Sequence, residues 1–282
     1  MLPSDRIDGS KGDFSLFIKW VFNDMAAKKF RARFIFLLID LVMALWMAVT
    51  TILYTFILGL GVIILRLFSG SRNVSFQAAR LWAWLMLKTN GVKIKIEGLE
   101  KIQADQSYVF MSNHLSHLDP LPVILMRPHP LCFVAKKSLE KIPIFGWGAR
   151  QIGVIFIDRG DTPQAIARIN QAIKELKGGV SAYFFAEGTR GTGRSLQPFK
   201  KGGVAMALKA RLPIVPITFL DSHKLFPKKA LRIKRGTLHV IVDEPIVASA
   251  HGEEDKAVLL EKVRSAIAEN LRRSPPAPGL DV

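Results

Sequence analysis

The longest hydrophobic stretch of the chain runs from Phe34 to Leu65 and contains one charged residue, Asp40. As a helix it would be about 48 Å long, which exceeds the hydrocarbon core of a bilayer at about 30 Å. A single tilted span from Leu41 to Leu65 fits that thickness, and two half-length helices would instead dip into the membrane as a hairpin. Basic residues flank the stretch on both sides, so the pattern slightly favours the hairpin, and the single span stays open.

The stretch that precedes it, Phe14–Phe30, mixes aromatic side chains with lysines, as an interfacial amphipathic helix does. We therefore expect residues 1–33 to form a basic and aromatic interfacial segment. Residues 34–70 then form the membrane-embedded part, an apolar helical anchor at the N-terminal end. A buried core helix of a soluble domain is disfavoured, because such helices seldom run this long without a polar face.

Downstream of the anchor, short apolar runs alternate with helical patterns. Strands are expected at Val92–Gly98, Tyr108–Met111, Cys132–Ala135, Gly153–Ile157, Ser181–Phe185, Pro213–Phe219 and Leu238–Val242, and helices at Thr162–Leu176, Gly202–Ala210 and Glu253–Leu271. The alternation predicts an α/β domain over residues 71–271, with a mixed, largely buried sheet flanked by helices. A proline inside the sixth run indicates an edge strand or an irregularity. Residues 272–282 are expected to be a disordered tail.

Charge adds information about partners. The chain has 282 residues, with 40 Lys and Arg against 23 Asp and Glu, and a net charge of +17. Residues 1–33 carry +3 and residues 34–70 carry 0, so residues 71–282 carry +14. A basic domain tethered to a bilayer suggests an anionic membrane surface or phosphorylated substrates. Nucleic acid is disfavoured, because no helix-turn-helix, RNP-type motif or Cys/His finger accompanies the charge.

The single cysteine, Cys132, cannot form an internal disulfide and excludes a metal cluster built on several thiolates. A reducing compartment is therefore expected.

The first candidate for chemistry is the sequence SNHLSHLDP, which connects a predicted strand to a helix start. His114 can take a proton from a hydroxyl, and a nearby carboxylate, Asp119, can fix its tautomer. Two alternatives stay open at this point, since Asp119 can be only a helix cap and His117 is an equally local histidine. A metal site from these three residues lacks further His or Cys ligands, and no metal is expected.

The second candidate is the sequence FFAEGTRGTGR, a glycine-containing loop after a strand. Arg190 can bind two phosphate oxygens at once, and Glu187 can accept a hydrogen bond from a substrate hydroxyl. A solvated surface turn is the alternative. In GVIFIDRG, Asp158 and Arg159 end another strand and would share the same sheet edge, and Lys200 lies near the start of the next helix.

Four blocks, NHLSHLD, GVIFIDR, FAEGTR and LPIVPI, follow one another in that order. Their order and spacing resemble the glycerolipid acyltransferase family, in particular bacterial 1-acyl-sn-glycerol-3-phosphate acyltransferases. That family has an NHxxxxD motif, a strand ending in (D/N)R, an FPEGTR motif and a proline-bearing apolar strand. The resemblance covers roughly Lys88–Pro245, and it departs from the family at Ala186, where proline is usual.

The resemblance implies acyl transfer from a thioester of coenzyme A or acyl-carrier protein to the sn-2 hydroxyl of lysophosphatidate, giving phosphatidate. His114 would be the general base, oriented by Asp119, and no cofactor beyond the thioester co-substrate is implied. The substrate-binding residues implied by the resemblance are Glu187, Gly188, Thr189, Arg190, Arg159 and Lys136. Of these, Glu187 and Gly188 would position the glycerol, and Arg190, Arg159 and Lys136 would hold the phosphate.

Other readings stay open within and outside this class. The acceptor can be another lysolipid or glycerol-3-phosphate, and the protein can be a thioester hydrolase or a lipid-binding scaffold. No enzyme nucleophile is evident, because the chain has no GxSxG motif and Cys132 falls in a predicted strand. We expect the bacterial inner membrane, with the catalytic domain on its cytoplasmic face. The sequence leaves open the donor, the acyl-chain length and the oligomeric state.

Overall fold

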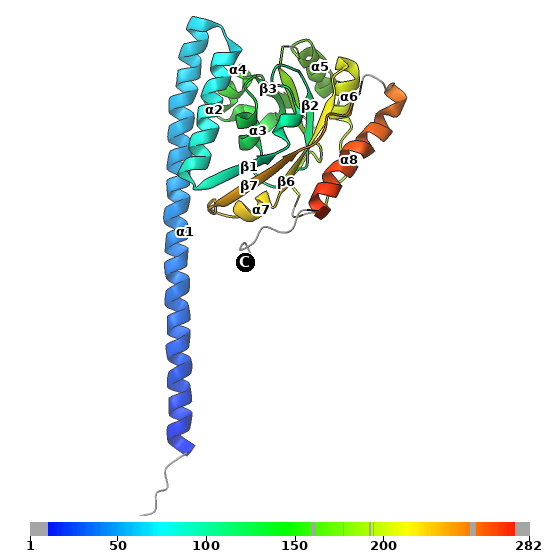
Figure 1. Cartoon of the computed structure of the whole chain (residues 1–282). Coiled ribbons are helices and arrows are strands. Elements are labelled where there is room, and N and C mark those ends of the chain that lie inside the picture. The colour runs from blue at the N-terminus through cyan, green and yellow to red at the C-terminus, as the bar shows by residue number, and fades with distance from the viewer. Residues whose placement is uncertain are drawn as a thin grey trace, which may run out of the picture. The chain divides into compact units, whose positions relative to one another are not determined.

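The computed structural model describes residues 11–158, 162–176, 178–191, 193, 195–248 and 252–273. The chain divides into two compact units, Met1–Trp46 and Met47–Val282. The described part of the first unit belongs entirely to helix α1 (Lys11–Ser69), which continues into the second unit. The second unit holds the sheet and the remaining helices (Figure 1).

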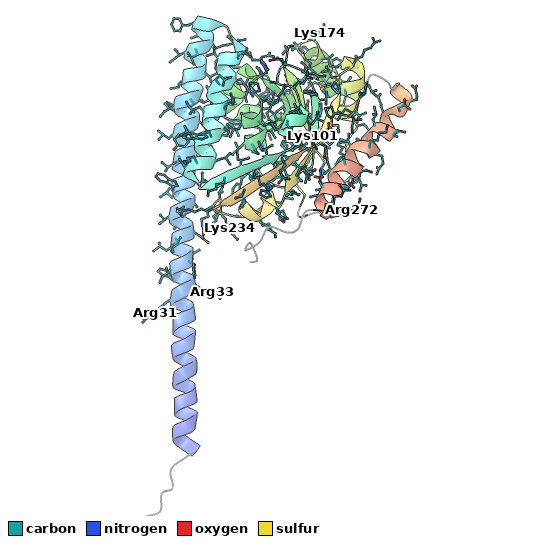
Figure 2. The ribbon with its side chains drawn as sticks, in the orientation of Figure 1. Arg31, Arg33, Lys101, Lys174, Lys234 and Arg272 are labelled. Carbon is teal, nitrogen blue, oxygen red and sulfur yellow. The ribbon has the colours of Figure 1, made fainter. Side chains whose placement is uncertain are left out.

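Helix α1 includes a candidate membrane span of 36 residues, Arg33–Phe68, which contains an 18-residue window with a mean hydropathy of 2.3. This stretch is long and apolar enough to cross a membrane, judged by its length and composition alone. Arg31 and Arg33, labelled in Figure 2, lie on α1 at the start of this stretch. Large apolar side chains on α1 are exposed, among them Phe36 at 67% and Leu45 at 64%. An exposed apolar helix is stabilised by a lipid environment, so the structure suggests association with a membrane.

The hairpin that the sequence favoured is not formed between residues 34 and 65, because α1 continues without a break to Ser69. The stretch contains no proline, and a helix tolerates its two glycines, Gly59 and Gly61. The chain turns back later, at Gly70, whose φ of 62° suits a residue without a side chain. Helix α2 (Arg72–Thr89) follows, which the sequence analysis missed, and its Trp82 donates a hydrogen bond to Thr55 of α1 at 3.1 Å.

The second unit is built on one seven-stranded sheet. The strands are β1 (Val92–Glu97), β2 (Val109–Ser112), β3 (Leu131–Lys136), β4 (Ile155–Ile157), β5 (Ser181–Phe185), β6 (Ile214–Leu220) and β7 (Gly236–Val242). Their order is β1-β7-β6-β2-β5-β3-β4, with every neighbouring pair parallel except β6 and β7. The predicted mixed, largely buried sheet is confirmed.

Helices cover both faces of this sheet. They are α3 (Pro120–Met126), α4 (Phe145–Gln151), α5 (Thr162–Ile173), α6 (Gly202–Ala210), α7 (Ser222–Leu225) and α8 (Lys256–Arg273), with short 3-10 turns η1 (Leu99–Lys101), η2 (Lys137–Lys141) and η3 (Glu253–Asp255). Figure 1 shows α6 and α8 on the side of the sheet opposite α2 and α3. A hydrophobic core lies on each face of the sheet, and β2 contributes side chains to both. Phe110 packs on the face covered by α2 and α3, while Val109 and Met111 pack on the face covered by α6 and α8.

Strand β6 lies between β7 and β2 and is buried at every position, so the edge interpretation of its proline is wrong. The irregularity is present instead. Regular antiparallel pairing with β7 begins only at Ile217, one residue after Pro216, and Asp243 N–H donates to the Pro216 carbonyl at 3.0 Å.

At the other end of the chain, α8 continues to Arg273, which takes in the first two residues of the predicted tail. Residues 274–282 lie outside the described residues.

Candidate active site

The predicted site residues gather at the carboxyl ends of parallel strands. His114 and Glu187 each lie two residues beyond their strands, β2 and β5, while Lys136 ends β3 and Asp158 follows β4. Because β2, β5, β3 and β4 are neighbours and parallel, these ends lie along one edge of the sheet. Ligand sites of open α/β sheets form at this edge.

His114 and Asp119 form a hydrogen-bonded pair, with Nδ1 and Oδ2 2.8 Å apart. The histidine side chain is 16% exposed and the aspartate side chain 0%. Asp119 stands at the N-cap position of α3, with Pro120 next, but its side chain makes no capping bond to the helix. Oδ2 accepts instead from the N–H groups of Leu115 at 2.7 Å and Ser116 at 2.8 Å, within the same loop. The alternative role as a helix cap is therefore not realised.

This pairing determines which ring nitrogen is free. With Nδ1–H donated to Asp119, the Nε2 atom of His114 carries a lone pair and can accept a proton. The ring also stacks on Phe185, with centroids 4.0 Å apart, which restricts its rotation. The side chain lines the large cavity described below.

Glu187 is 2% exposed, and each of its oxygens accepts a backbone hydrogen bond. Oε1 accepts from His114 N–H at 2.8 Å and Oε2 from Gln197 N–H at 3.0 Å. Burial raises the pKa of Glu187, and these two N–H donors partly oppose the rise. The carboxylate thus fastens the His114 loop to the loop after β5, a role that the sequence did not reveal. Its bond to a substrate hydroxyl stays a prediction.

The rest of the FAEGTR segment is held closely against the His114 loop. Gly188 has a φ of 72°, which favours glycine, and Gly191 N–H donates to the His114 carbonyl at 2.7 Å. Ala186 N–H donates to the Ser112 carbonyl at 2.8 Å. A proline at 186, usual in the resembling family, has no N–H and cannot make this bond. The departure at Ala186 thus adds a bond between β5 and β2.

Arg190 is half-buried and Thr189 exposed, and both line the cavity. The pKa of His117 is lowered, first by burial and second by the charge of Arg190, which places the guanidinium near that ring. Lys136 lines the same cavity from β3. Arg159 lies outside the described residues, so its predicted role is not addressed by the structure.

The structure adds two residues that the sequence analysis missed. Lys228, on the chain after α7, lines the cavity together with the already noted Lys200, and the basic pair in the sequence FPKKA was its only signal. Asn113 makes two hydrogen bonds to the backbone of Phe219, at 2.8 and 3.0 Å. Asn113, next to His114, therefore anchors the loop to β6.

The cavity has a volume of about 1100 Å³. Its wall includes polar side chains, among them His114, His117, Lys136, Glu187, Arg190, Lys200 and Lys228. It also includes many apolar side chains, among them Val62, Trp82, Ile124, Phe133, Phe145 and Ile166. A cavity of this size lined by both charged and apolar groups suits an amphiphile with an anionic head.

Other chemistries find less support in the described part of the chain. Cys132 is 1% exposed in β3, and burial raises the pKa of its thiol to about 11. A thiol in that state is a poor nucleophile. Among the described residues, no group of three or more His, Cys, Asp or Glu side chains is arranged to hold a metal ion.

Comparison with protein families gives one match, a model described as Acyltransferase, over residues 93–220. The chain is 32% identical over 199 residues to the 1-acyl-sn-glycerol-3-phosphate acyltransferase of Borreliella burgdorferi, covering 71% of this chain and 80% of that protein. It is 35% identical over 195 residues to the chloroplastic 1-acyl-sn-glycerol-3-phosphate acyltransferase of Arabidopsis thaliana, covering 68% of this chain and 53% of the relative. The match thus spans about half the length of the plant relative.

Among solved structures, the chain is similar to the crystal structure of the 1-acyl-sn-glycerophosphate acyltransferase of Thermotoga maritima. The TM-score is 0.71 at 22% identity, covering 84% of this chain and 98% of the other. This likeness concerns the fold.

Proposed function

The chain belongs to the 1-acyl-sn-glycerol-3-phosphate acyltransferase family, and we propose that it transfers a fatty acyl group from a thioester to the sn-2 hydroxyl of lysophosphatidate. The product is phosphatidate, in phospholipid biosynthesis. The observation that carries this proposal is the His114–Asp119 pair, 2.8 Å apart, with His114 lining a largely apolar cavity of about 1100 Å³. A base and a lipid-sized space thus occur together.

His114 acts as the general base. Its Nε2 takes the proton of the acceptor hydroxyl as the hydroxyl oxygen attacks the thioester carbonyl carbon. A tetrahedral intermediate forms, its carbon–sulfur bond breaks, and the ester remains. The proton passes from the imidazolium to the departing thiolate, so the enzyme returns to its starting state. The buried carboxylate of Asp119 stabilises the imidazolium between these two transfers.

Direct transfer needs no acyl-enzyme. This fits the buried thiol of Cys132, whose pKa of about 11 keeps it protonated at neutral pH.

Arg190 and Lys136 bind the phosphate of the acceptor, with Arg159 as a further candidate. Both described residues line the cavity that His114 also lines. An arginine can hold two phosphate oxygens at once, and a lysine adds a point charge. Gly188 and Thr189 shape the loop between base and phosphate.

The donor is an acyl thioester of coenzyme A or of acyl-carrier protein. Exposed basic residues occur on well separated parts of the second unit, including Lys101, Lys174, Lys234 and Arg272, labelled in Figure 2. Such a surface suits the phosphates of coenzyme A, an acidic carrier protein and anionic lipid alike.

We place the protein at the cytoplasmic face of a bacterial inner membrane. The apolar span of α1 supports the membrane assignment, and the single cysteine agrees with a reducing compartment.

A transfer assay tests the proposal. Detergent-solubilised protein is given palmitoyl-coenzyme A or palmitoyl-acyl-carrier protein, with lysophosphatidate, glycerol-3-phosphate or lysophosphatidylcholine as acceptor. Phosphatidate and free thiol formed in equal amounts, only with lysophosphatidate, support the proposal. Thiol release without any acceptor points to a hydrolase. Turnover of glycerol-3-phosphate or lysophosphatidylcholine instead would make that acceptor the substrate in place of lysophosphatidate. No turnover with any acceptor favours a lipid-binding role.

A further inference from the structure

Asp119 has a second carboxylate oxygen, which faces away from His114 and has its own donor. Ser222, at the start of α7, donates its Oγ–H to Oδ1 at 2.6 Å. Both residues are fully buried, at 0% exposure. We infer that Ser222 is a positioning residue for the base, one that holds the carboxylate of Asp119 in the orientation that His114 needs. The inference rests on the proposed function.

The carboxylate depends on hydrogen-bond donors for its stability. Within the described part of the chain, no Lys or Arg forms an ion pair with Asp119. Three donors, His114 Nδ1–H and the backbone N–H groups of Leu115 and Ser116, converge on Oδ2. Ser222 is the donor on Oδ1. A buried charge without a cation is costly unless each oxygen is hydrogen-bonded, so this bond is of the stronger, charge-assisted kind.

The bond also helps to fix a torsion that the side-chain rotamer leaves free, together with the three donors on Oδ2. The terminal torsion of an aspartate side chain is broad, so the rotamer alone does not decide how the carboxylate plane is turned. With donors on both oxygens, the plane is held so that Oδ2 faces the imidazole. Without Ser222 only the donors on Oδ2 hold the plane, so it is fixed less tightly and the Nδ1–H bond that keeps the Nε2 lone pair toward the substrate weakens.

Ser222 is itself placed by a segment fastened to the base-bearing loop on both sides. Before it, the side-chain amide of Asn113 bonds twice to the backbone of Phe219. After it, Ser116 Oγ–H donates to the Phe226 carbonyl at 3.1 Å. Asp221, with a φ of 52°, makes the sharp turn from β6 into α7 that directs the serine inward. This segment lies beyond the four sequence blocks, so its part in the site is visible only in the fold.

The main test compares Ser222→Ala with Ser222→Thr, which retains the hydroxyl. We expect Ser222→Ala to lower kcat about 10-fold with an unchanged KM for lysophosphatidate, and Ser222→Thr to recover most of the loss. In an Asp119→Asn background the alanine substitution should change kcat by less than about 2-fold, because the charged partner is already gone.

The matched control is Ser181→Ala. Ser181 is also 0% exposed and its Oγ is also hydrogen-bonded, to Tyr108 N–H and the Gly179 carbonyl, but it lies at the opposite end of β5 from the site. It should lower the melting temperature as Ser222→Ala does, with kcat unchanged. A wild-type kcat in Ser222→Ala, or an equal kcat loss in both alanine variants, overturns the inference.

A second readout is independent of turnover, so it separates a failure of this inference from a failure of the proposed function. In ¹⁵N-histidine-labelled protein, the ring signals of His114 are assigned by their loss in His114→Ala. We expect a protonated Nδ1 and an unprotonated Nε2 in the wild type and in Ser222→Thr, and a mixture of tautomers in Ser222→Ala. Identical ring signals in the wild type and Ser222→Ala overturn the inference, whether or not lysophosphatidate is a substrate.

Discussion

The Oε1 atom of Glu187 accepts a hydrogen bond from the backbone N–H of His114 at 2.8 Å. The carboxylate after β5 therefore holds the main chain of the histidine that follows β2. Glu187 and Asp119 both hold His114 in place. Glu187 binds its backbone N–H, and Asp119 binds its imidazole ring. Two distant parts of the sequence thus hold His114, because Glu187 lies 73 positions after it while Asp119 lies in its own loop.

Glu187→Gln is expected to lower both activity and stability. Two backbone N–H groups, those of His114 and Gln197, donate to the two oxygens of Glu187. A glutamine amide has only one oxygen, so one of these N–H groups loses its acceptor. We expect a loss of about 1–3 kcal/mol in the free energy of unfolding, measured by urea denaturation in detergent. Glu100→Gln, at an exposed position of η1, controls for the loss of one negative charge. Equal stability of the two variants would contradict the role given to Glu187.

The difference in the free energy of unfolding between the wild type and Glu187→Gln should depend on pH. Burial raises the pKa of Glu187 above its ordinary value of 4.5, so the folded protein binds this proton more tightly than the unfolded chain. Its contribution to the free energy of unfolding therefore falls as pH rises from 4.5 through the folded pKa. The stability advantage of the wild type over Glu187→Gln should shrink over that window. An advantage that grows with pH there would show that the pKa is lowered.

Cys132→Ala is expected to retain activity within about 2-fold. Its stability should fall modestly, because removing the sulfur leaves a small cavity. The thiol is buried with a pKa of about 11, so it carries no acyl group in the reaction. Iodoacetamide should label it slowly at pH 7.5 in the folded protein and rapidly in urea. A well-folded Cys132→Ala variant with a large loss of kcat would instead indicate a thioester intermediate.

The apolar cavity should set the acyl-chain length. A Cβ at Gly148, on the wall formed by α4, would meet no atom within 4 Å, so a side chain can enter the cavity without moving the backbone. We expect Gly148→Met to shift the preference toward shorter chains, measured in a competition between C8 and C16 thioesters or between lysophosphatidates of those lengths. Gly61→Met is the matched control, since it has equal space but does not line the cavity. A similar shift in both variants would argue against the cavity as the binding site.

Arg190→Gln is expected to raise the KM for lysophosphatidate about 10-fold or more, because a charge-assisted bond to phosphate is lost. Arg264→Gln, in an exposed ion pair on α8, controls for the change in net charge. The pKa of His117 provides an internal check, since the charge of Arg190 lowers it. It should rise in Arg190→Gln when followed by NMR. An unchanged KM together with the raised pKa of His117 would place Arg190 near the site but off the phosphate.

Local patterns in the sequence predict many of the elements. Strand Ser181–Phe185 and helix Gly202–Ala210 were predicted with their observed limits, because glycines, prolines and polar residues bound clear apolar patterns. Helix α2 was missed although Phe76, Ala83, Met86 and Leu87 have helical spacing, since polar residues dilute the pattern. Helix α1 was expected to break, but residues 34–65 contain no residue that requires a turn.

Contacts between side chains of the site were predictable only where the residues share a loop. His114 and Asp119 are five positions apart, so the strand-to-helix connection that holds both could be inferred. Ser222 lies 103 positions from Asp119, and only the β2–β6 pairing brings the two together. The backbone bonds of Glu187 were equally hidden, because a sequence does not reveal which N–H groups a carboxylate will meet.

The most direct test of the account is the effect of His114→Ala on acceptor-dependent acyl transfer. Wild type and variant are compared under saturating lysophosphatidate and thioester, following free thiol and phosphatidate together, with melting temperature as the check on folding. The account predicts that a folded His114→Ala variant loses about 10²–10⁴-fold in kcat, the range expected for a general base. A folded variant that still makes phosphatidate at the wild-type rate would contradict the assignment of His114 as the base.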